Sequence, residues 1–157
     1  MTIAVGQKAP DFTAIDSDNK PFTLSHIKGK NVVLAFYPAT FSGVCDKEMC
    51  TFRDSMSELN KVNAEVVGIS VDPRWSVKEF KTKHNLNFPL VSDWDHKIIK
   101  LYGVEWPNFG GMQGYSAATR SIFVLDSTGT VRWSWVTDGQ GKEPDYAAIK
   151  TALAALK

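Results

Sequence analysis

One stretch of the chain, residues 37–50, runs from a strand pattern into a long helical pattern, and both cysteines lie in it. Val32 to Tyr37 is a nearly continuous run of β-branched and aromatic residues, which predicts a strand covered on both faces, as in a parallel sheet. The helix after Gly43 is predicted to reach about Asn63, because apolar residues recur on one face at steps of four and three. These residues are Cys45, Met49, Phe52, Met56 and Leu59. A strand that leads directly into such a helix indicates a layered α/β fold.

The remaining apolar runs extend this pattern over the whole chain. Further strands are expected over residues 12–15, 22–24, 65–71, 121–125 and 131–135, with a short extended piece over 88–91. Further helices are expected over residues 76–84, 95–102 and from Pro144 onward, and residues 106–119 are expected to be a loop. This order predicts a thioredoxin-like fold, with a central mixed sheet flanked by helices and an N-terminal β-hairpin. A length of 157 residues fits one domain, residues 1–157.

Composition excludes several classes of partner. The net charge is +1, so nothing points to nucleic acid or to an acidic membrane surface. No apolar run is long enough to cross a bilayer, and residues 1–8 contain no signal-peptide core, so we expect a cytoplasmic protein. Two cysteines five residues apart are too few and too close for a secreted disulfide framework. In a reducing compartment such a pair is more often redox-active or metal-binding than structural.

Cys45 lies in the first turn of the predicted helix, where a thiolate is easiest to form. Unpaired backbone N–H groups and the positive end of the helix dipole stabilise an anion there, so we expect the pKa of Cys45 to be lowered. Pro38 has no N–H and is expected to shield the thiolate from water. Ser42 offers a hydroxyl that either holds a substrate oxygen or caps the helix. Glu48 either compensates the helix dipole or takes part in the site.

The pattern Pro38-x-x-x-Ser42-x-x-Cys45 resembles the active-site signature of the peroxiredoxins, in which Thr or Ser stands three residues before the peroxidatic cysteine. Glu48 matches the acidic position three residues after that cysteine. The segment that begins at Arg120 resembles the one that carries the active-site arginine of the family. Other similar segments are residues 6–12, 88–93 and 101–104, so the resemblance covers essentially the whole chain.

Within this family, the pair Cys45 and Cys50 is similar to that of the bacterioferritin comigratory (Q-type) group. The resemblance implies that Cys45 reduces hydrogen peroxide and organic hydroperoxides and becomes a sulfenic acid, with Arg120 and Ser42 stabilising the transition state. It also implies that Cys50 resolves the sulfenic acid as a disulfide, which a thioredoxin-like donor reduces. Residues five apart on an ideal helix have Cα atoms roughly 8.7 Å apart. A disulfide needs less than about 7 Å, so the first helical turns are expected to unwind.

Other interpretations remain open beside this one. Cys50 is expected on a polar face of the helix, but a one-cysteine mechanism would leave it a spectator. A thioredoxin-type reductase would carry C-x-x-C, and the spacing here is wider. A non-enzymatic copper-binding protein of the same fold would use both thiols and a histidine, but His84 and His96 are expected at the surface. No cofactor or metal is expected, and the oligomeric state, monomer or homodimer, is left open.

Aromatic residues near the predicted site have no assigned role from the sequence. Tyr37 and Phe41 form either a wall of a peroxide pocket or part of the core. The loop residues Trp106, Phe109 and Tyr115 line the pocket entrance, form a subunit contact or cover the core. The residue types fit each of these alternatives, and the sequence does not choose among them.

Overall fold

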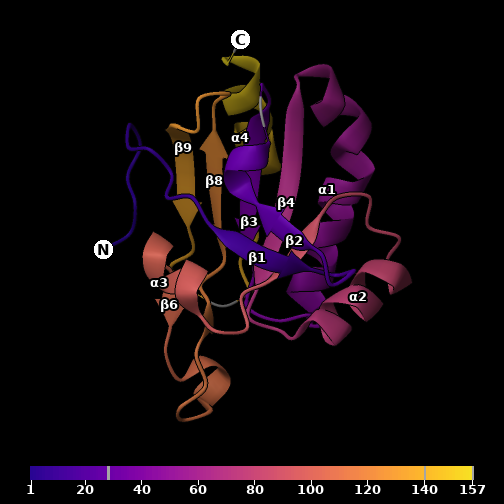
Figure 1. Cartoon of the computed structure of the whole chain (residues 1–157), viewed down its shortest axis with the longest axis vertical. Helices are drawn as coiled ribbons and strands as arrows, with labels where there is room; N and C mark the ends of the chain where they lie inside the picture. The colour runs from indigo at the N-terminus through magenta and orange to yellow at the C-terminus, as the bar shows by residue number, and fades with distance from the viewer. Residues whose placement is uncertain (28, 140, 157) are drawn as a thin grey trace.

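A seven-stranded mixed sheet runs through the centre of the computed structural model, which describes residues 1–27, 29–139 and 141–156. The strand order is β2-β1-β5-β4-β3-β8-β9, in which β3, β4 and β5 are parallel and every other pair of neighbouring strands is antiparallel (Figure 1). The prediction of a thioredoxin-like layout with an N-terminal hairpin is confirmed. The hairpin extends the main sheet, because β1 pairs with β5 through Ile15 and Ser92.

The elements agree with the predicted ones to within a few residues. The strands of the main sheet are β1 (Thr13–Asp16), β2 (Pro21–Thr23), β3 (Asn31–Phe36), β4 (Ala64–Ser70), β5 (Leu90–Ser92), β8 (Ser121–Leu125) and β9 (Val131–Val136). The α-helices are α1 (Gly43–Lys61), α2 (Arg74–Lys83), α3 (Lys97–Tyr102) and α4 (Tyr146–Ala154), and a 3-10 helix η1 covers Leu24–His26. Helix α3 begins two residues later than expected, because the carboxylate of Asp93 accepts hydrogen bonds from the N–H groups of Ile98 and Ile99 and so fixes its first turn.

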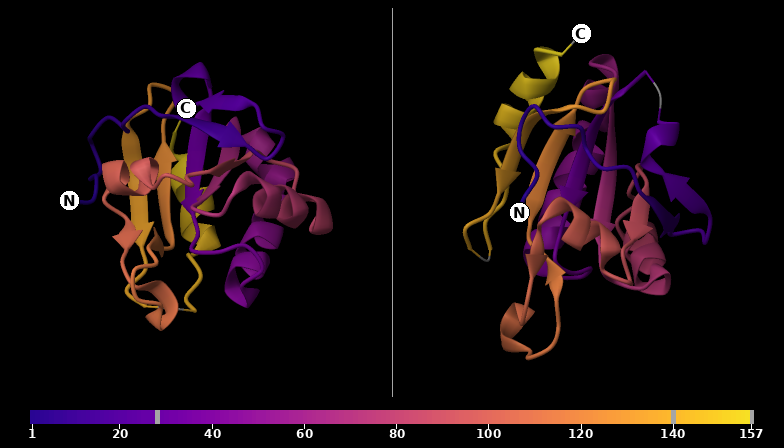
Figure 2. Two further views of the ribbon diagram at one scale, coloured as in Figure 1. Left: turned by 60° about the horizontal axis from the view of Figure 1, so that its bottom comes forward. Right: turned by 60° about the vertical axis from the view of Figure 1, so that its left-hand side comes forward.

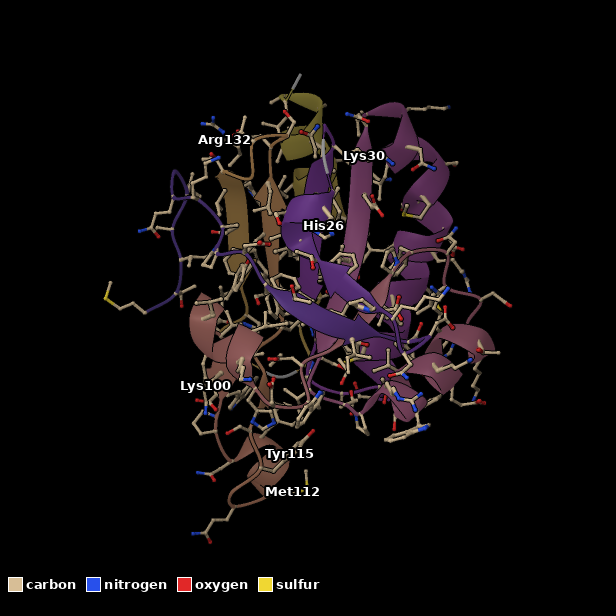
Figure 3. The ribbon with its side chains drawn as sticks, viewed as in Figure 1. His26, Lys30, Lys100, Met112, Tyr115 and Arg132 are labelled. Carbon is tan, nitrogen blue, oxygen red and sulfur yellow. The ribbon has the colours of Figure 1, made fainter. Side chains whose placement is uncertain are left out.

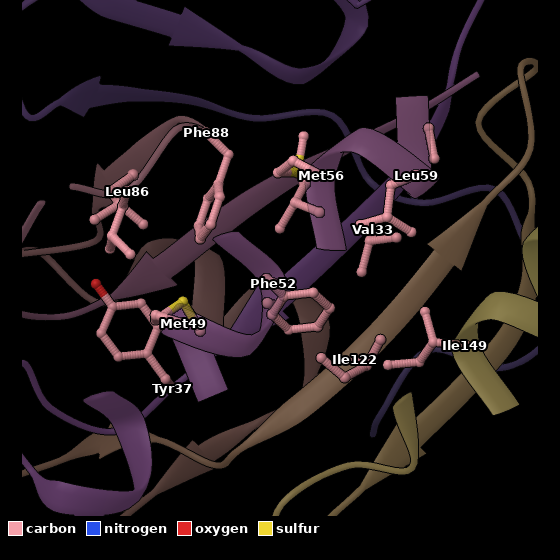
Figure 4. Packing of buried hydrophobic residues seen from close by; sticks show 14 of the residues in the cluster. Val33, Tyr37, Met49, Phe52, Met56, Leu59, Leu86, Phe88, Ile122 and Ile149 are labelled. Carbon is pink, nitrogen blue, oxygen red and sulfur yellow. The ribbon is translucent and has the colours of Figure 1, made fainter. Parts of the chain in front are cut away.

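Two hydrophobic clusters lie on the two faces of this sheet. One cluster joins the inward stripe of α1 to residues of α2 and α4, and Figure 4 shows Met49, Phe52 and Ile149 within it. The other cluster places Ile99 and Tyr102 of α3 against the opposite face. Figure 2 shows the ribbon of the sheet and its helices from two further directions. Because β3 lies between the two clusters, all six of its residues are buried, as its continuous apolar pattern predicts.

Gly68 in β4 leaves room for the Leu90 side chain of β5. A Cβ atom at this position would clash with the Leu90 side chain and would lie 3.4 Å from Tyr37 Cε1 and 3.5 Å from Met49 Sδ. Any larger residue would therefore displace the Leu90 side chain, whereas Tyr37 and Met49 would stay in ordinary van der Waals contact. No helix in the described ranges is long and apolar enough to span a membrane.

The segment predicted as a loop, residues 106–119, contains secondary structure, so that prediction was wrong in part. A short antiparallel pair joins β6 (Glu105–Trp106) to β7 (Ala117–Ala118), with a 3-10 turn η2 (Phe109–Gly111) at its far end. We call residues 105–118 the arm. It projects from one end of the molecule, and Figure 3 labels Met112 and Tyr115 on it. Two-residue strands carry too little periodicity to be recognised from sequence.

Candidate active site

A tight connection between β3 and α1 positions Cys45. Phe41 has a positive φ of 64°, which reverses the chain before the helix. Ser42 is the N-cap of α1, and its Oγ accepts a hydrogen bond from the Cys45 N–H at 3.4 Å. The N–H of Thr40 donates to Asp72 Oδ2 at 2.9 Å, which ties this connection to the end of β4. Cys45 therefore lies in the first turn of α1, at the carboxyl edge of the parallel strands, where ligands of open α/β sheets bind.

Arg120 joins Cys45 to Glu48 in a buried triad. It precedes β8, which pairs with β3, so the sheet brings it back to the start of α1. Its Nη2 group donates to Cys45 Sγ at 3.1 Å, and its Nη1 group donates to Glu48 Oε1 at 2.6 Å. The side chains of Arg120 and Glu48 are 5% and 0% exposed, and Cys45 is fully buried. One guanidinium therefore contacts a thiol and a carboxyl group away from water.

Burial dominates the electrostatics of this triad. Desolvation raises the pKa of the Cys45 thiol, and the nearby Arg120 charge and the Ser42 hydroxyl lower it by less. Desolvation likewise raises the pKa of Glu48 to about 7 against the opposing effect of Arg120. Burial disfavours the charge on Arg120, but Glu48 and Cys45 outweigh this and raise its pKa. Glu48 Oε2 is buried and has no hydrogen-bond partner in the described part of the chain, so only Oε1 of this carboxyl group contacts the guanidinium.

The expectation of a lowered pKa for Cys45 was wrong, because burial raises this pKa by more than the neighbouring groups lower it. The features behind it are present, because the thiol lies in the first turn of α1 and contacts an arginine. The helix pattern placed Cys45 on the inward stripe, but the pattern does not show how completely the surrounding segments cover the sulfur. The structure leaves Cys45 0% exposed, and this loss of hydration is the larger effect.

A cavity of about 170 Å³ opens beside the triad. Pro38, Ser42 and Arg120 line it on one side, and Trp106 and Phe109 of the arm line it as well. The remaining lining residues are Gly43, Val44, Thr137, Gly139 and Gly141. Cys45 does not line this cavity, although the residues directly before it do. The cavity volume suits a small molecule with an apolar part, since aromatic and polar groups share its wall.

The structure brings together four of the five residues singled out from the sequence, namely Pro38, Ser42, Cys45 and Arg120. Cys50 lies one turn further along α1, is partly exposed and is a free thiol like Cys45. Because α1 is a continuous helix through both cysteines, its ideal geometry keeps their Cα atoms roughly 8.7 Å apart. The second thiol therefore does not reach the triad in this state.

Glu48 is the functional-site residue for which sequence reasoning left the role open. Its place one turn after Cys45 was visible, but its ion pair with Arg120 joins residues 72 positions apart. Tyr37 is fully buried in the core and Phe41 is 44% exposed, and neither lines the cavity. Trp106 and Phe109 do line it, so the arm contributes to the site.

The histidines are not gathered with the thiols. His84 was expected at the surface, but its side chain is only 19% exposed and lies 3.4 Å from Asp46. His96 is half-buried at the start of α3. Among the residues that the structure describes, no group of three or more His, Cys, Asp and Glu side chains is placed to hold a metal ion. The geometry gives the copper-binding alternative no supporting contact.

The pKa of Glu48 predicts a pH dependence of stability. The folded chain holds the Glu48 proton up to about pH 7, whereas an exposed glutamate releases it near about pH 4.3. Between these values the folded state binds more protons than the unfolded state, so the free energy of unfolding falls as pH rises. Glu48→Gln cannot ionise and is expected to remove about 1–3 kcal/mol of this fall.

Urea unfolding at about pH 5 and pH 8 measures this difference. Glu79→Gln, on the exposed face of α2, is the matched control and should follow the wild type. Equal losses of stability in wild type and Glu48→Gln would contradict the prediction.

Comparison with known proteins adds family information to this geometry. Residues 5–134 match the model of the AhpC/TSA family. The chain is 43% identical over 131 residues to a putative chloroplastic peroxiredoxin Q of Oryza sativa subsp. indica, which covers 83% of this chain and 58% of that protein. It is 40% identical over 137 residues to a putative peroxiredoxin bcp of Coxiella burnetii, which covers 86% of this chain and 89% of that one.

A solved structure is similar over nearly the whole chain. A cysteine-to-serine mutant of PrxQ from Xylella fastidiosa superposes with a TM-score of 0.86 at 26% identity, over 99% of this chain and 98% of that one. The chain thus spans less than two thirds of the rice protein but almost all of this bacterial one.

Proposed function

Because this chain belongs to the AhpC/TSA family and is a peroxiredoxin similar to the peroxiredoxin Q and Bcp proteins, we propose that it is a thiol-dependent peroxidase acting through Cys45. The observation that carries the proposal is the hydrogen bond from Arg120 Nη2 to Cys45 Sγ at 3.1 Å, beside a small cavity. A fixed positive charge at the sulfur favours the thiolate, which is the form of cysteine that attacks. The substrates are hydrogen peroxide and organic hydroperoxides.

The first step is a two-electron oxidation of Cys45. Its thiolate attacks the terminal oxygen of the hydroperoxide, an S–O bond forms and the O–O bond breaks. The leaving oxygen takes a proton and departs as water or alcohol, and Cys45 is left as a sulfenic acid. Negative charge spreads over both oxygens in the transition state, where Arg120, the Ser42 hydroxyl and the Cys45 N–H stabilise it. The Cys45 N–H is available because its capping bond to Ser42 is long, at 3.4 Å.

The second step joins the two thiols. The Cys50 thiolate attacks Cys45 Sγ, the S–S bond forms and the S–O bond breaks, and the hydroxide takes a proton to leave as water. Bridging the roughly 8.7 Å of an ideal helix requires the first turns of α1 to unwind. Pro38 covers the first thiol until then, and a thioredoxin-like donor afterwards reduces the disulfide.

Peroxide consumption with a thioredoxin donor tests this cycle. The wild type is expected to turn over continuously, whereas Cys50→Ser should consume about one equivalent of peroxide per chain and then stall. The reason is that the donor can reach the Cys45–Cys50 disulfide after α1 has unwound. In Cys50→Ser no disulfide forms, so the Cys45 sulfenic acid stays buried and the donor cannot reach it. Mass spectrometry of alkylated samples identifies the state of each cysteine.

A small dithiol serves as the control in the same assay. It should restore some turnover to Cys50→Ser by reaching the sulfenic acid directly. Normal turnover of Cys50→Ser with the thioredoxin donor would instead favour the one-cysteine alternative, in which Cys50 is a spectator.

A further inference from the structure

Contacts at the start of α1 determine how readily its first turns open. If the proposed function holds, Cys50 reaches Cys45 only after these turns unwind, so the resolving rate depends on the population of the opened state. The carboxyl end of α2 packs beside these first turns of α1.

His84 is the residue through which α2 contacts α1 at two points. Its Nε2 atom lies 3.4 Å from Asp46 Oδ2, directly after Cys45 in the chain. Its backbone carbonyl accepts a hydrogen bond from Arg53 Nη1 at 2.6 Å. Cys50 lies between these two contacts in α1 and Cys45 directly precedes the first, so unwinding of this segment disturbs both contacts.

The His84 ring also holds the connection that precedes α1. Its centroid is 5.1 Å from that of Phe80 and 6.5 Å from that of Phe41, and Phe41 packs edge-on against Phe80 at 5.4 Å. Phe41 is the residue whose positive φ turns the chain into the helix. The ring therefore secures the entry to α1 as well as its first turn. We call His84, Asp46, Arg53 and Phe41 the α2 clasp.

Protonation of His84 would turn its contact with Asp46 into an ion pair. His84 Nε2 lies 3.4 Å from Asp46 Oδ2 but makes no hydrogen bond within the described ranges, so charge is what would hold the two side chains together. An imidazolium would form an ion pair with Asp46, whose side chain is only 31% exposed. The other charged or titratable groups nearby are Arg53 and Cys50 of α1 and Lys83 of α2, whose Nζ lies 5.5 Å from the Phe41 ring.

We propose that His84 is a positioning residue for the resolving step, and that its protonation keeps the first turns of α1 closed. With the imidazolium paired to Asp46, opening breaks an ion pair and the sulfenic acid waits longer for Cys50. With a neutral ring, opening costs less and the disulfide forms sooner. A longer-lived sulfenic acid can react with a second peroxide molecule. The O–O bond of that peroxide breaks and the sulfenic acid is oxidised to a sulfinic acid.

The test compares wild type with His84→Phe, which keeps a ring against Phe41 and Phe80 but cannot carry charge. Each protein receives about one equivalent of peroxide, is quenched by alkylation, and its sulfenic acid and disulfide are followed separately by mass spectrometry. Histidine changes charge between about pH 5 and pH 8, so rates are measured near both ends of this range. His84→Phe is expected to form the disulfide about two- to fivefold faster than wild type near pH 6 and at a similar rate near pH 8.

Taking the ratio of the two proteins at each pH cancels the titration of Cys50, which is common to both. Asp46→Asn removes the α1 partner of the ion pair and should accelerate disulfide formation by the same factor. The double variant, with both His84→Phe and Asp46→Asn, should be no faster than either single variant. His26→Gln, on η1, is the matched histidine control and should behave as wild type (Figure 3).

Two negative outcomes are distinct. A ratio that is the same at both pH values, or additive effects of the two substitutions, overturns the role of His84 although the disulfide still forms. Absence of any Cys45 oxidation in the wild type overturns the proposed function itself.

Discussion

Cys45→Ser is expected to lower peroxide consumption by at least ~10³-fold with any thiol donor. A serine hydroxyl does not ionise in this pH range and is a far weaker nucleophile than a thiolate, so the Arg120 guanidinium has no anion to direct at the peroxide. The substitution changes one atom of the buried triad, and the fold should persist. The rate of peroxide loss, followed with excess dithiol to bypass the need for Cys50, measures the effect.

Cys50→Ser is the matched control for this experiment, because it replaces the same type of atom five residues along the same helix. With the dithiol it should react with the first peroxide as fast as wild type. Circular dichroism of both variants checks that α1 is intact. Full activity of Cys45→Ser in a folded protein would refute the peroxidase proposal.

Arg120→Lys is expected to slow the reaction of Cys45 with peroxide by about 10²–10³-fold. The guanidinium donates from separate nitrogens to Cys45 Sγ and to Glu48 Oε1, at 3.1 and 2.6 Å, and a lysine ammonium cannot reproduce this planar fork. Lysine keeps the positive charge, so the buried Glu48 is not left without a cation. Competition kinetics with a second peroxidase isolates the first chemical step.

Arg132→Lys is the matched control for this second experiment. Arg132 lies on β9, is 51% exposed and pairs with Asp126, so its replacement should leave the rate unchanged. The pKa of Cys45 in Arg120→Lys, read from the pH dependence of its alkylation, separates loss of the thiolate from loss of transition-state contacts. A rate within twofold of wild type would show that the second nitrogen of Arg120 is not needed.

Much of the fold could be predicted because its strongest signals are local. The apolar run of β3 and the four-three spacing of α1 each extend over several residues. The first predicts a strand buried on both faces, and the second predicts a helix that packs one face against the sheet. The arm could not be predicted in the same way. Trp106 pairs with Ala117 across a turn rich in glycine, and neither two-residue strand has a period of its own.

In the candidate site, too, the part that could be predicted is the part made by residues close together in the chain. Pro38, Ser42 and Cys45 are close in the chain, and their spacing by itself determined that a thiol would begin a capped helix after a buried strand. The roles of these residues, and those of Cys50 and Arg120, stay predictions until the variants above are measured.

Two properties were decided by the tertiary structure alone: the distances between residues far apart in the chain, and how far each of these residues is exposed to water. Glu48 meets Arg120 across 72 positions, and His84 meets Asp46 across two helices. Burial reversed the expected direction of the Cys45 pKa, because desolvation depends on every segment that covers the sulfur. Sequence spacing fixes which side chains share a turn of helix, but hydration and long-range contacts arise only when the sheet and helices close around them.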